Sequence, residues 1–423
     1  KFPFMEQWKE YKETEFGKIP NSWDVATIKE ETKVVVDYVA NGSFASLAEN
    51  VKYKTEEDYA VLIRLVDYKN NYNGNFVFID KEAYEFLGKS KLFGDEIIIS
   101  NVGANVGTVF KCPRLKYKMS LAPNSIMVKF KGNNDFYYYW LKSPFGQHML
   151  HSIVTGSAQP KFNKTNFREM SIPVPPIEIQ EKIAQLLKPL DEKIEVNKQI
   201  NSNLEEQAKA LFKSWFIDFE PFKDGKFVDS ELGKIPEGWN MMSFESFISE
   251  SQDKAMVGAY PAYSVTNNGI TPRTEKFKKQ LSKATSKEKI LRKNDLVFGM
   301  SRQILNWGIM QDEIGSVSSA YHVYKIDKER TCPTYLRYFI KGYESYFRDL
   351  IGTAAREGQS LDKGALMNKK LLVPSKEILR SFIQHVTTIE NTISLFKSQC
   401  RRLSTLRDTL LPRLMSGEIE VRS

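Results

Sequence analysis

Few stretches of the sequence bring together residue types that could do chemistry. Gly88-Lys89-Ser90 matches the end of a phosphate-binding loop, but Ala83 stands where the first glycine of that loop belongs, so we interpret it as a turn. Asp191-Glu192-Lys193 matches half of a nuclease metal site, but it falls within a helical pattern rather than a strand. His148 and His151 could share a helix face, yet no third ligand accompanies them, so we expect no metal site.

The signatures of common enzyme classes are also missing. Val174–Ile177 reads VPPI, which resembles the Asp/Asn-Pro-Pro-aromatic loop of adenine methyltransferases. It lacks both the polar first residue and the aromatic last residue with which such a loop holds a flipped base. No G-x-S-x-G motif and no dinucleotide-binding glycine fingerprint occurs. We therefore expect no catalytic residue and no cofactor in this chain.

The composition is that of a globular chain with a basic surface. Its 423 residues predict two to three domains, and a hydrophobic content of 41% allows each to bury a core. The net charge of +9 is compatible with a nucleic-acid partner, and equally with solvated lysines. Three distant cysteines favour a reducing compartment. Without a long apolar run or a secretory signal, we expect no membrane contact and a cytoplasmic location. The KFPF segment before Met5 is interpreted as a tag remnant or an alternative start.

One phrase occurs twice in the chain. GKIPNSW at Gly17–Trp23 returns as GKIPEGW at Gly233–Trp239, an offset of 233 − 17 = 216 residues. Deeper in each half, GDEIIIS resembles KNDLVFGMS, which places Asp95 opposite Asp295 at an offset of 200. The first copy therefore carries about 16 extra residues before Asp95 (216 − 200 = 16), which we expect to form a loop. A repeat of this length predicts two copies of one structural unit.

Each copy ends in a proline-containing stop followed by heptads. MSIPVPPIEIQEKI from Met170 aligns with KKLLVPSKEILRSF from Lys369, at 369 − 170 = 199. Apolar residues then recur at the spacing of a coiled-coil seam, in register between the copies. The apolar seam residues are Ile183, Leu187, Leu190, Ile194, Leu204 and Leu211 in the first helix, and Phe382, Val386, Ile389, Ile393, Phe396, Leu403, Leu410 and Leu414 in the second.

The two helices are predicted to pair antiparallel. Asn197 and Asn201 interrupt the first seam, where polar residues fix register at a cost in stability, and Arg407 is expected opposite them. Ser375 is a predicted N-cap and Gly417 a predicted stop of the second helix. Pro189 should kink the first helix, because it removes a backbone donor.

Between these landmarks each unit has mixed α and β patterns. The aromatic residues of two short predicted helices recur at helical spacing, and we interpret them as core rather than as base-stacking platforms. The predicted strands are Ala60–Val66, Glu96–Ser100, Ser125–Phe130, Asp295–Gly299 and Tyr321–Ile326, and the predicted short helices are Asp135–Leu150 and Thr334–Ile351.

Taken together, these motifs resemble one family over nearly the whole chain. A GKIPxxW start and a unit ending in IPVPPIEIQEKIAQLLKPLDEKIE, both repeated, are similar to the specificity subunit of a Type I restriction–modification enzyme. GSVSSAYHVYKI is similar too, although Ala320 stands where many members have proline. Pro189 also departs from the commonest form.

The resemblance implies an α+β fold with a pseudo-twofold internal repeat. Two mixed α/β target-recognition domains (residues 5–172 and 223–374) would be separated by a central conserved helix (173–222) and a C-terminal conserved helix (375–423), paired as an antiparallel coiled coil. It further implies that the chain recognises an asymmetric bipartite site in double-stranded DNA. Two methyltransferase subunits carrying S-adenosylmethionine and two restriction subunits using ATP and Mg²⁺ would bind to it. The alternative hypothesis is a coiled-coil scaffold that assembles partner enzymes without reading DNA.

The residues that contact DNA are expected among polar and basic side chains on loops, because Arg, Lys, Asn and Gln reach base edges and Ser, Thr and Lys reach phosphates. The candidates in the first domain are Asn41, Ser43, Asn101, Asn105, Lys116, Lys118, Thr155, Gln159 and Lys161, and those in the second are Asn267, Asn268, Arg273, Arg302, Asn306, Arg356 and Gln359.

Overall fold

A computed structural model describes residues 5–6, 10–266, 269–273, 287–299, 305–351 and 361–421. The chain divides into two compact units. The first unit comprises Lys1–Lys198 with Ser398–Ser423, and the second comprises Gln199–Lys397. Each unit therefore contains one end of both long helices, together with a globular part.

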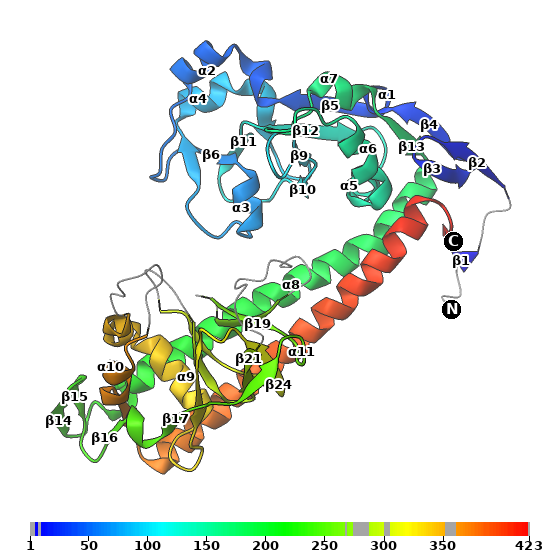
Figure 1. The fold of residues 1–423 in the computed structure, drawn as a ribbon. Helices are drawn as coiled ribbons and strands as arrows, with labels where there is room; N and C mark the ends of the chain where they lie inside the picture. Colours follow the sequence, from blue (N-terminus) through cyan, green and yellow to red (C-terminus); the bar gives the residue numbers. More distant parts are fainter. Residues whose placement is uncertain are drawn as a thin grey trace. The chain divides into compact units, whose positions relative to one another are not determined.

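The globular part of the first unit contains two four-stranded sheets, ordered β10-β9-β12-β5 and β7-β6-β11-β8 (Figure 1). The elements are β1 (Met5–Glu6), β2 (Tyr11–Thr14), β3 (Gly17–Pro20), β4 (Asp24–Thr27), α1 (Ile28–Glu31), β5 (Thr32–Asp37), α2 (Phe44–Asn50), β6 (Ala60–Ile63), α3 (Leu65–Lys69), β7 (Val77–Ile79), α4 (Lys81–Phe86), β8 (Lys91–Leu92), β9 (Ile97–Ser100), β10 (Val109–Lys111), β11 (Lys118–Leu121), β12 (Ser125–Phe130), α5 (Asn134–Lys142), α6 (Pro144–Ser152), α7 (Lys164–Glu169), β13 (Ser171–Val174), the start of α8 (Ile177–Phe216), and β27 (Glu420–Val421).

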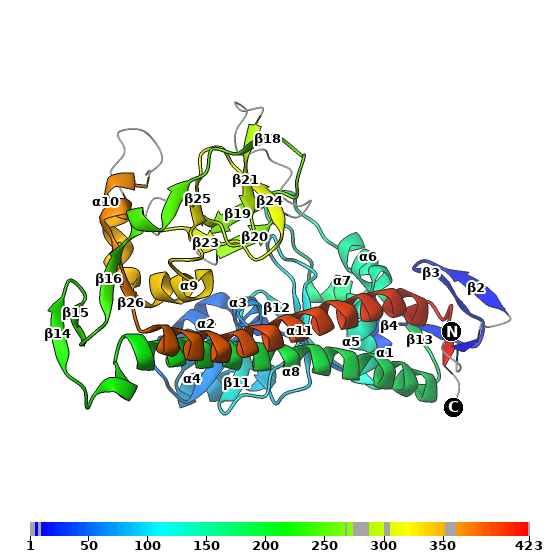
Figure 2. The ribbon, with the colours of Figure 1, turned by 90° about the horizontal axis from the view of Figure 1, so that it is seen from below.

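In the second unit, the main sheet has the order β17-β25-β22-β23, and α9 packs against β23 (Figure 2). The elements are β14 (Phe227–Ser230), β15 (Gly233–Pro236), β16 (Asn240–Ser243), β17 (Ile248–Glu250), β18 (Lys254–Met256), β19 (Tyr263–Thr266), β20 (Gly269–Pro272), β21 (Lys287–Arg292), β22 (Leu296–Phe298), β23 (Trp307–Ile309), β24 (Ile314–Val317), β25 (His322–Ile326), α9 (Pro333–Gly342), α10 (Lys363–Asn368), β26 (Lys370–Val373) and the start of α11 (Lys376–Met415).

The repeated sequence phrases occupy equivalent elements of the two units. Each GKIP segment is the second strand of a hairpin, as β3 beside β2 and as β15 beside β14. The two proline-containing stops form β13, which pairs with β4, and β26, which pairs with β16. The sheet order β10-β9-β12-β5 matches β23-β22-β25-β17, strand for strand.

The turn before β9 and β22 corrects the sequence alignment by one residue. Glu96 accepts a hydrogen bond from the backbone N of Phe93 at 3.2 Å, and Asp295 accepts one from the backbone N of Arg292 at 2.8 Å. Asp95 has φ 78° and Asn294 has φ 71°, so these two residues occupy the same left-handed turn position. Asp295 therefore corresponds to Glu96 and not to Asp95. Both are buried carboxylates that accept a backbone hydrogen bond in the turn, directly after the left-handed residue.

Three expectations about local structure were wrong. The segment 135–150 is not one helix, because Ser143 caps a new helix through the backbone N of Gly146 and Pro144 occupies its first turn. Likewise α9 ends at Gly342 and is followed by a 3-10 helix, Glu344–Leu350. The extra residues of the first copy lie between β5 and β6, where helix α2 forms in place of an extended loop.

The apolar seam of the long helices is buried or half-buried in both units. In the first unit, Ile183 and Leu187 are fully buried in one cluster with Leu410 and Leu414. In the second, Phe382 is fully buried, with ring centroids 4.9 Å from Phe216 and 5.9 Å from Phe212. The aromatics of α5 and α9, including Trp140 and Phe339, belong to the same two cores, as predicted.

Polar contacts show that the helices run antiparallel within each unit. In the first unit, Asp191 pairs with Arg407 at 2.6 Å, and further along α8 Asn197 donates to Gln399 at 3.2 Å. In the second unit, Glu205 pairs with Lys397 at 3.1 Å, and further along α8 the ring of Phe216 lies 4.9 Å from that of Phe382 between centroids. Partner numbers on α11 fall as those on α8 rise. Arg407 therefore binds Asp191, not the two asparagines that we expected it to face.

The predicted ends of α11 are confirmed. The Ser375 hydroxyl accepts a hydrogen bond from the backbone N of Ile378 at 3.4 Å. Gly417 has φ +66°, and a Cβ at this position would lie 2.4 Å from Pro20 Cγ, so glycine allows both the turn and its contact with β3. Helix α8 continues through Pro189 as one helix. None of the helices in the described ranges is long and apolar enough to cross a membrane.

The seam generates a stability prediction. Phe382→Ala should destabilise the second unit by about 3–5 kcal/mol, because the substitution leaves a cavity among buried aromatic rings. The thermal unfolding midpoint should fall by roughly 10 °C for a unit of this size. Leu395→Ala on the same helix is the matched control, since Leu395 is 57% exposed, and it should change the midpoint little. If differential scanning fluorimetry showed equal shifts of the unfolding midpoint in both variants, the assignment of Phe382 to a buried seam would be contradicted.

Candidate nucleic-acid interface

Two loops of the first unit are joined into one surface. Residues 101–107 follow β9 and residues 153–163 connect α6 to α7. The backbone N of Gly103 donates to Pro160 O at 2.8 Å, and the backbone N of Phe162 donates to Asn101 O at 3.1 Å. Val102 and Lys161 form an isolated antiparallel bridge. We call these two segments the loop pair.

The two ends of the second loop are hydrogen-bonded to each other, and its tip makes a tight turn. The backbone N atoms of Thr155 and Lys161 each donate to the other residue's carbonyl, at 2.8 and 2.9 Å. Between them Gly156 has φ +86°, and a Cβ there would lie 2.9 Å from Gln159 O. The tip therefore requires glycine. Thr155, Gln159 and Lys161 are all exposed at this loop, so three predicted residues are brought together.

The two predicted asparagines of the first loop differ in role. Asn105 is exposed, and its Oδ1 accepts a hydrogen bond from Lys69 Nζ at 2.6 Å. Lys69, at the end of α3, thus joins the surface, although no sequence motif pointed to it. Asn101 Nδ2 donates to Phe162 O at 3.1 Å across the loop pair, and no described residue donates to its buried Oδ1. Asn101 therefore fastens the two loops together.

The other four candidates of the first unit lie on other elements. Asn41 donates to Tyr38 O and Ser90 Oγ and accepts from Lys89 N, so its amide is fully engaged. Gly88–Ser90 itself forms a 3-10 turn, as interpreted.

The remaining three are on the surface. Ser43 is exposed and caps α2 through the backbone N of Ser46 at 3.2 Å. Lys116 lies 3.5 Å from Glu57, and Lys118 is exposed at the start of β11.

The second unit repeats the backbone contacts that join the two ends of each loop, which we call the feet of the loops. The backbone N of Gly299 donates to Asn306 O at 2.7 Å where the β22–β23 loop closes, as Ser100 N donates to Thr108 O in the first unit. Ile351 and Leu361 form an isolated bridge, as Thr155 and Lys161 do.

Five candidates of the second unit, Asn267, Asn268, Arg302, Arg356 and Gln359, lie outside the described residues. Arg273 Nε donates to Ser264 Oγ at 3.0 Å, and no described residue accepts from its buried Nη2.

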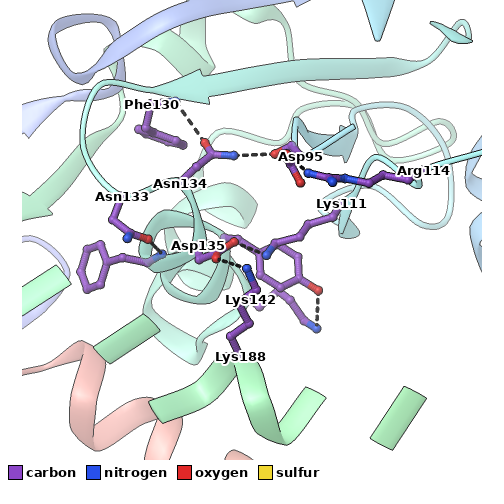
Figure 3. A network of polar contacts seen from close by, with 11 residues as sticks. Asp95, Lys111, Arg114, Phe130, Asn133, Asn134, Asp135, Lys142 and Lys188 are labelled. Carbon is purple, nitrogen blue, oxygen red and sulfur yellow. Dashed lines mark hydrogen bonds and ion pairs between the residues drawn. The ribbon is translucent and has the colours of Figure 1, made fainter. Parts of the chain in front are cut away.

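A network of charged side chains anchors the hairpin that carries the first loop (Figure 3). Lys111 of β10 and Lys188 of α8 both pair with Asp135 of α5. The distance from Lys188 Nζ to Asp135 Oδ2 is 3.2 Å. Asn134 Nδ2 donates to Asp95 O at 2.6 Å, before β9. Burial raises the pKa of the Asp135 carboxyl, but the two lysines outweigh it, so the pKa lies below its ordinary value. Asp135 is therefore ionised at neutral pH and ties the hairpin to α8.

The chemistry of the loop pair is hydrogen bonding. Its exposed polar side chains are amides, two hydroxyls and one lysine, which suit base edges and phosphates. His151 Nδ1 lies 2.6 Å from Gln147 O within its own helix. Among the described residues, no group of three or more His, Cys, Asp or Glu side chains gathers where a metal could bind.

The known proteins to which this chain is similar are specificity subunits of Type I restriction enzymes. Residues 5–206 match the family described as the Type I restriction modification DNA specificity domain. The Type I restriction enzyme MjaIX specificity subunit of Methanocaldococcus jannaschii is 28% identical, over 98% of this chain and 98% of that protein. The HindI specificity subunit of Haemophilus influenzae is also 28% identical, over 62% of this chain and 71% of its own length.

A solved structure with a similar fold supports this comparison. The crystal structure of the S subunit of a Type I restriction–modification system from M. genitalium aligns with a TM-score of 0.55. The alignment covers 93% of this chain and 96% of that chain, at 14% sequence identity. At this identity the likeness concerns the fold alone.

The tight tip generates a prediction about the loop pair. Gly156→Ala should disturb its hydrogen bonds, because alanine is strained at positive φ and its Cβ would meet Gln159 O. Amide hydrogen exchange at Gly103, Lys161 and Phe162 should become at least several-fold faster. Gly88→Ala is the control, because nothing lies within 4 Å of its added Cβ and its φ is not positive. Unchanged exchange in Gly156→Ala would show that the loops are held by other contacts.

Proposed function

We propose that this chain, which belongs to the family of Type I restriction specificity subunits, recognises an asymmetric bipartite sequence in double-stranded DNA and performs no catalysis itself. One observation carries the proposal: two units with the same strand order hold loops of different sequence at the same places. The first loop reads NVGANVG from Asn101, whereas residues 299–306 read GMSRQILN. Unlike loops on like scaffolds suit two half-sites of different sequence.

In the first half-site, we assign DNA contacts to the exposed side chains of the loop pair. Asn105 and Gln159 carry amides that can bind an adenine edge, and Lys161 can bind guanine or phosphate. Thr155 suits a phosphate. Ser43, Lys116 and Lys118 remain candidates for backbone contacts away from the loops, whereas Asn41 and Asn101 are assigned structural roles because their amides already hold the chain.

The contacts of the second half-site are assigned by correspondence. Asn306 stands at the foot of the loop that matches the first loop of the first unit, and Arg302 belongs to that loop by sequence. Arg356 and Gln359 fall between the bridged residues Ile351 and Leu361. Asn267, Asn268 and Arg273 complete the set as sequence-based candidates.

The long helices are assigned two roles. As an antiparallel coiled coil of forty-residue helices they would hold the two domains at a fixed separation, so that half-sites about one DNA turn (~34 Å) apart are read together. They would also bind the partner enzymes: two methyltransferase subunits with S-adenosylmethionine, and two restriction subunits with ATP and Mg²⁺. The contacts that support this pairing are those of the buried seam.

The function is tested by methylation-sensitive sequencing of DNA from cells that express this chain with its methyltransferase partner. The expected result is one methylated motif made of two different half-sites and a fixed spacer. Insertion of one heptad into both helices should lengthen the spacer and leave the half-sites unchanged, because only the domain separation changes. Cells with this chain alone should show no methylation. Methylation by the chain alone, or altered half-sites with the old spacer, would refute the respective part of the proposal.

The assigned base contacts make a separate prediction. Gln159→Ala should cost about 1–3 kcal/mol of binding on DNA with an intact first half-site, and much less on DNA with that half-site scrambled. Binding is measured with the methyltransferase complex by fluorescence anisotropy. Lys18→Ala, in the β2–β3 hairpin with its side chain 70% exposed, is the control and should bind as the parent does. An equal loss on both DNAs would remove Gln159 from base recognition.

A further inference from the structure

A compact group of charged residues in the second unit has no counterpart among the DNA-contact candidates. Glu250 of β17 binds Lys363 Nζ with both carboxylate oxygens at 2.8 Å, and its Oε1 lies 3.3 Å from His322 Nδ1. Lys289 of β21 donates to Tyr321 O at 2.6 Å, and Lys254 of β18 is its cross-strand partner. We call the five side chains of Glu250, Lys254, Lys289, His322 and Lys363 the Glu250 cluster.

The cluster carries more positive charge than its one carboxylate balances. Lys254 and Lys289 face each other in an antiparallel pair, where like charges are destabilising. Burial, together with Lys363 and Lys254, holds the pKa of Lys289 below its ordinary value despite the attraction of Glu250. Burial likewise lowers the pKa of His322, so the imidazole is largely neutral at neutral pH.

The neighbouring carboxylates are engaged elsewhere. Asp253 binds Arg292 at 2.5 Å and Lys325 at 3.2 Å. Glu288 accepts a hydrogen bond from Ser316 Oγ at 2.5 Å. The Glu250 cluster itself therefore contains three lysines and one carboxylate, which leaves an excess of positive charge.

Comparison with the first unit indicates that the scaffold does not need this excess. The first residues of α7 and α10, Lys164 and Lys363, each pair with a carboxylate, Lys164 with Asp37 at 3.0 Å. This helix-to-sheet ion pair is thus repeated. The register of β8 with β11 matches that of β21 with β24, and Ser90, the residue just before β8, thus corresponds to Lys289.

The same comparison applies to the histidine. Ile126 pairs with Ile99 and His322 pairs with Phe298, so Ile126 occupies the position of His322. The fold is thus formed in the first unit without either of these polar side chains.

The cluster lies at the feet of both loops of the second unit. His322 pairs directly with Phe298, the last residue of β22 before the β22–β23 loop. Lys363 follows two residues after Leu361, which closes the foot of the other loop through its bridge to Ile351. A duplex held by these loops would place its backbone close to the cluster.

We propose that Lys254, Lys289 and Lys363 bind a phosphate of the DNA backbone beside the second half-site. This inference rests on the proposed DNA-binding function and adds a contact that fixes position without reading bases. Ammonium groups on three elements supply charge-assisted hydrogen bonds to the phosphate oxygens. Glu250 holds Lys363 in place in the free protein and competes with the phosphate when DNA binds.

The test uses the chain assembled with its methyltransferase partner, in a salt titration of DNA binding by fluorescence anisotropy. Lys289→Ala should weaken binding roughly three- to tenfold, equally on cognate DNA and on DNA with the second half-site scrambled. The slope of log affinity against log salt should become shallower by about 0.9, the value for one lost phosphate contact. Lys254→Ala, at an exposed position, should reproduce both effects if Lys289→Ala lowers the melting temperature.

Two further variants make the test specific. Lys293→Ala removes the same charge from the same unit, but Lys293 pairs with Glu313 at 2.5 Å, before β22 rather than at its loop end, so the slope should not change. Glu250→Gln should strengthen binding several-fold on both DNAs, because it removes the competing carboxylate.

Each outcome decides the proposal. A slope in Lys289→Ala and Lys254→Ala equal to that of Lys293→Ala overturns it, as does a loss confined to cognate DNA, which would indicate base recognition instead. If the parent complex showed no salt-dependent binding to any duplex, the proposed function would fail, and the phosphate site with it.

Discussion

A forty-residue amphipathic helix cannot leave its apolar stripe in water, and this constraint governs the structure. In each unit the stripe of α8 is covered by α11, running the other way. The globular elements then pack onto what remains: Trp140 of α5 joins the cluster of Leu187 and Leu414, and Tyr335 of α9 lies 6.3 Å from Phe382 between ring centroids. The seam is therefore also the base on which each globular part is built.

Two acidic residues at equivalent positions fasten these layers in different ways. Asp191 and Glu390 are 390 − 191 = 199 residues apart, the offset of the repeat. Asp191 binds Arg407 of α11, which ties one long helix to the other. Glu390 binds Arg337 of α9, which ties a long helix to the globular part, and accepts from Tyr338 at 3.2 Å. A half-buried carboxylate is stabilised by a cation, and the fold supplies one from a different neighbouring helix in each unit.

The same division between fixed scaffold and variable surface explains how one chain can have two units that share a fold and differ at the surface. Strand order, turn geometry at Glu96 and Asp295, and the bridged loop feet are common to both units. The loop residues differ, and the Glu250 cluster adds charge to one unit only. Recognition can therefore change without loss of the core, because loop side chains at the surface contribute little to its packing.

The sequence by itself determined the features that depend on local periodicity: the heptad seam, the cap at Ser375, the stop at Gly417, strand β12 and the repeat. Tertiary structure alone decided which polar residues are available to a ligand. Asn41 and Asn105 are alike in sequence, but the amide of Asn41 is held by Ser90, 49 residues away. Glu250 likewise meets Lys363 across 113 residues. Periodicity is set by neighbours in the chain, whereas the partners of an amide or a carboxylate are set by which distant strands and helices pack together.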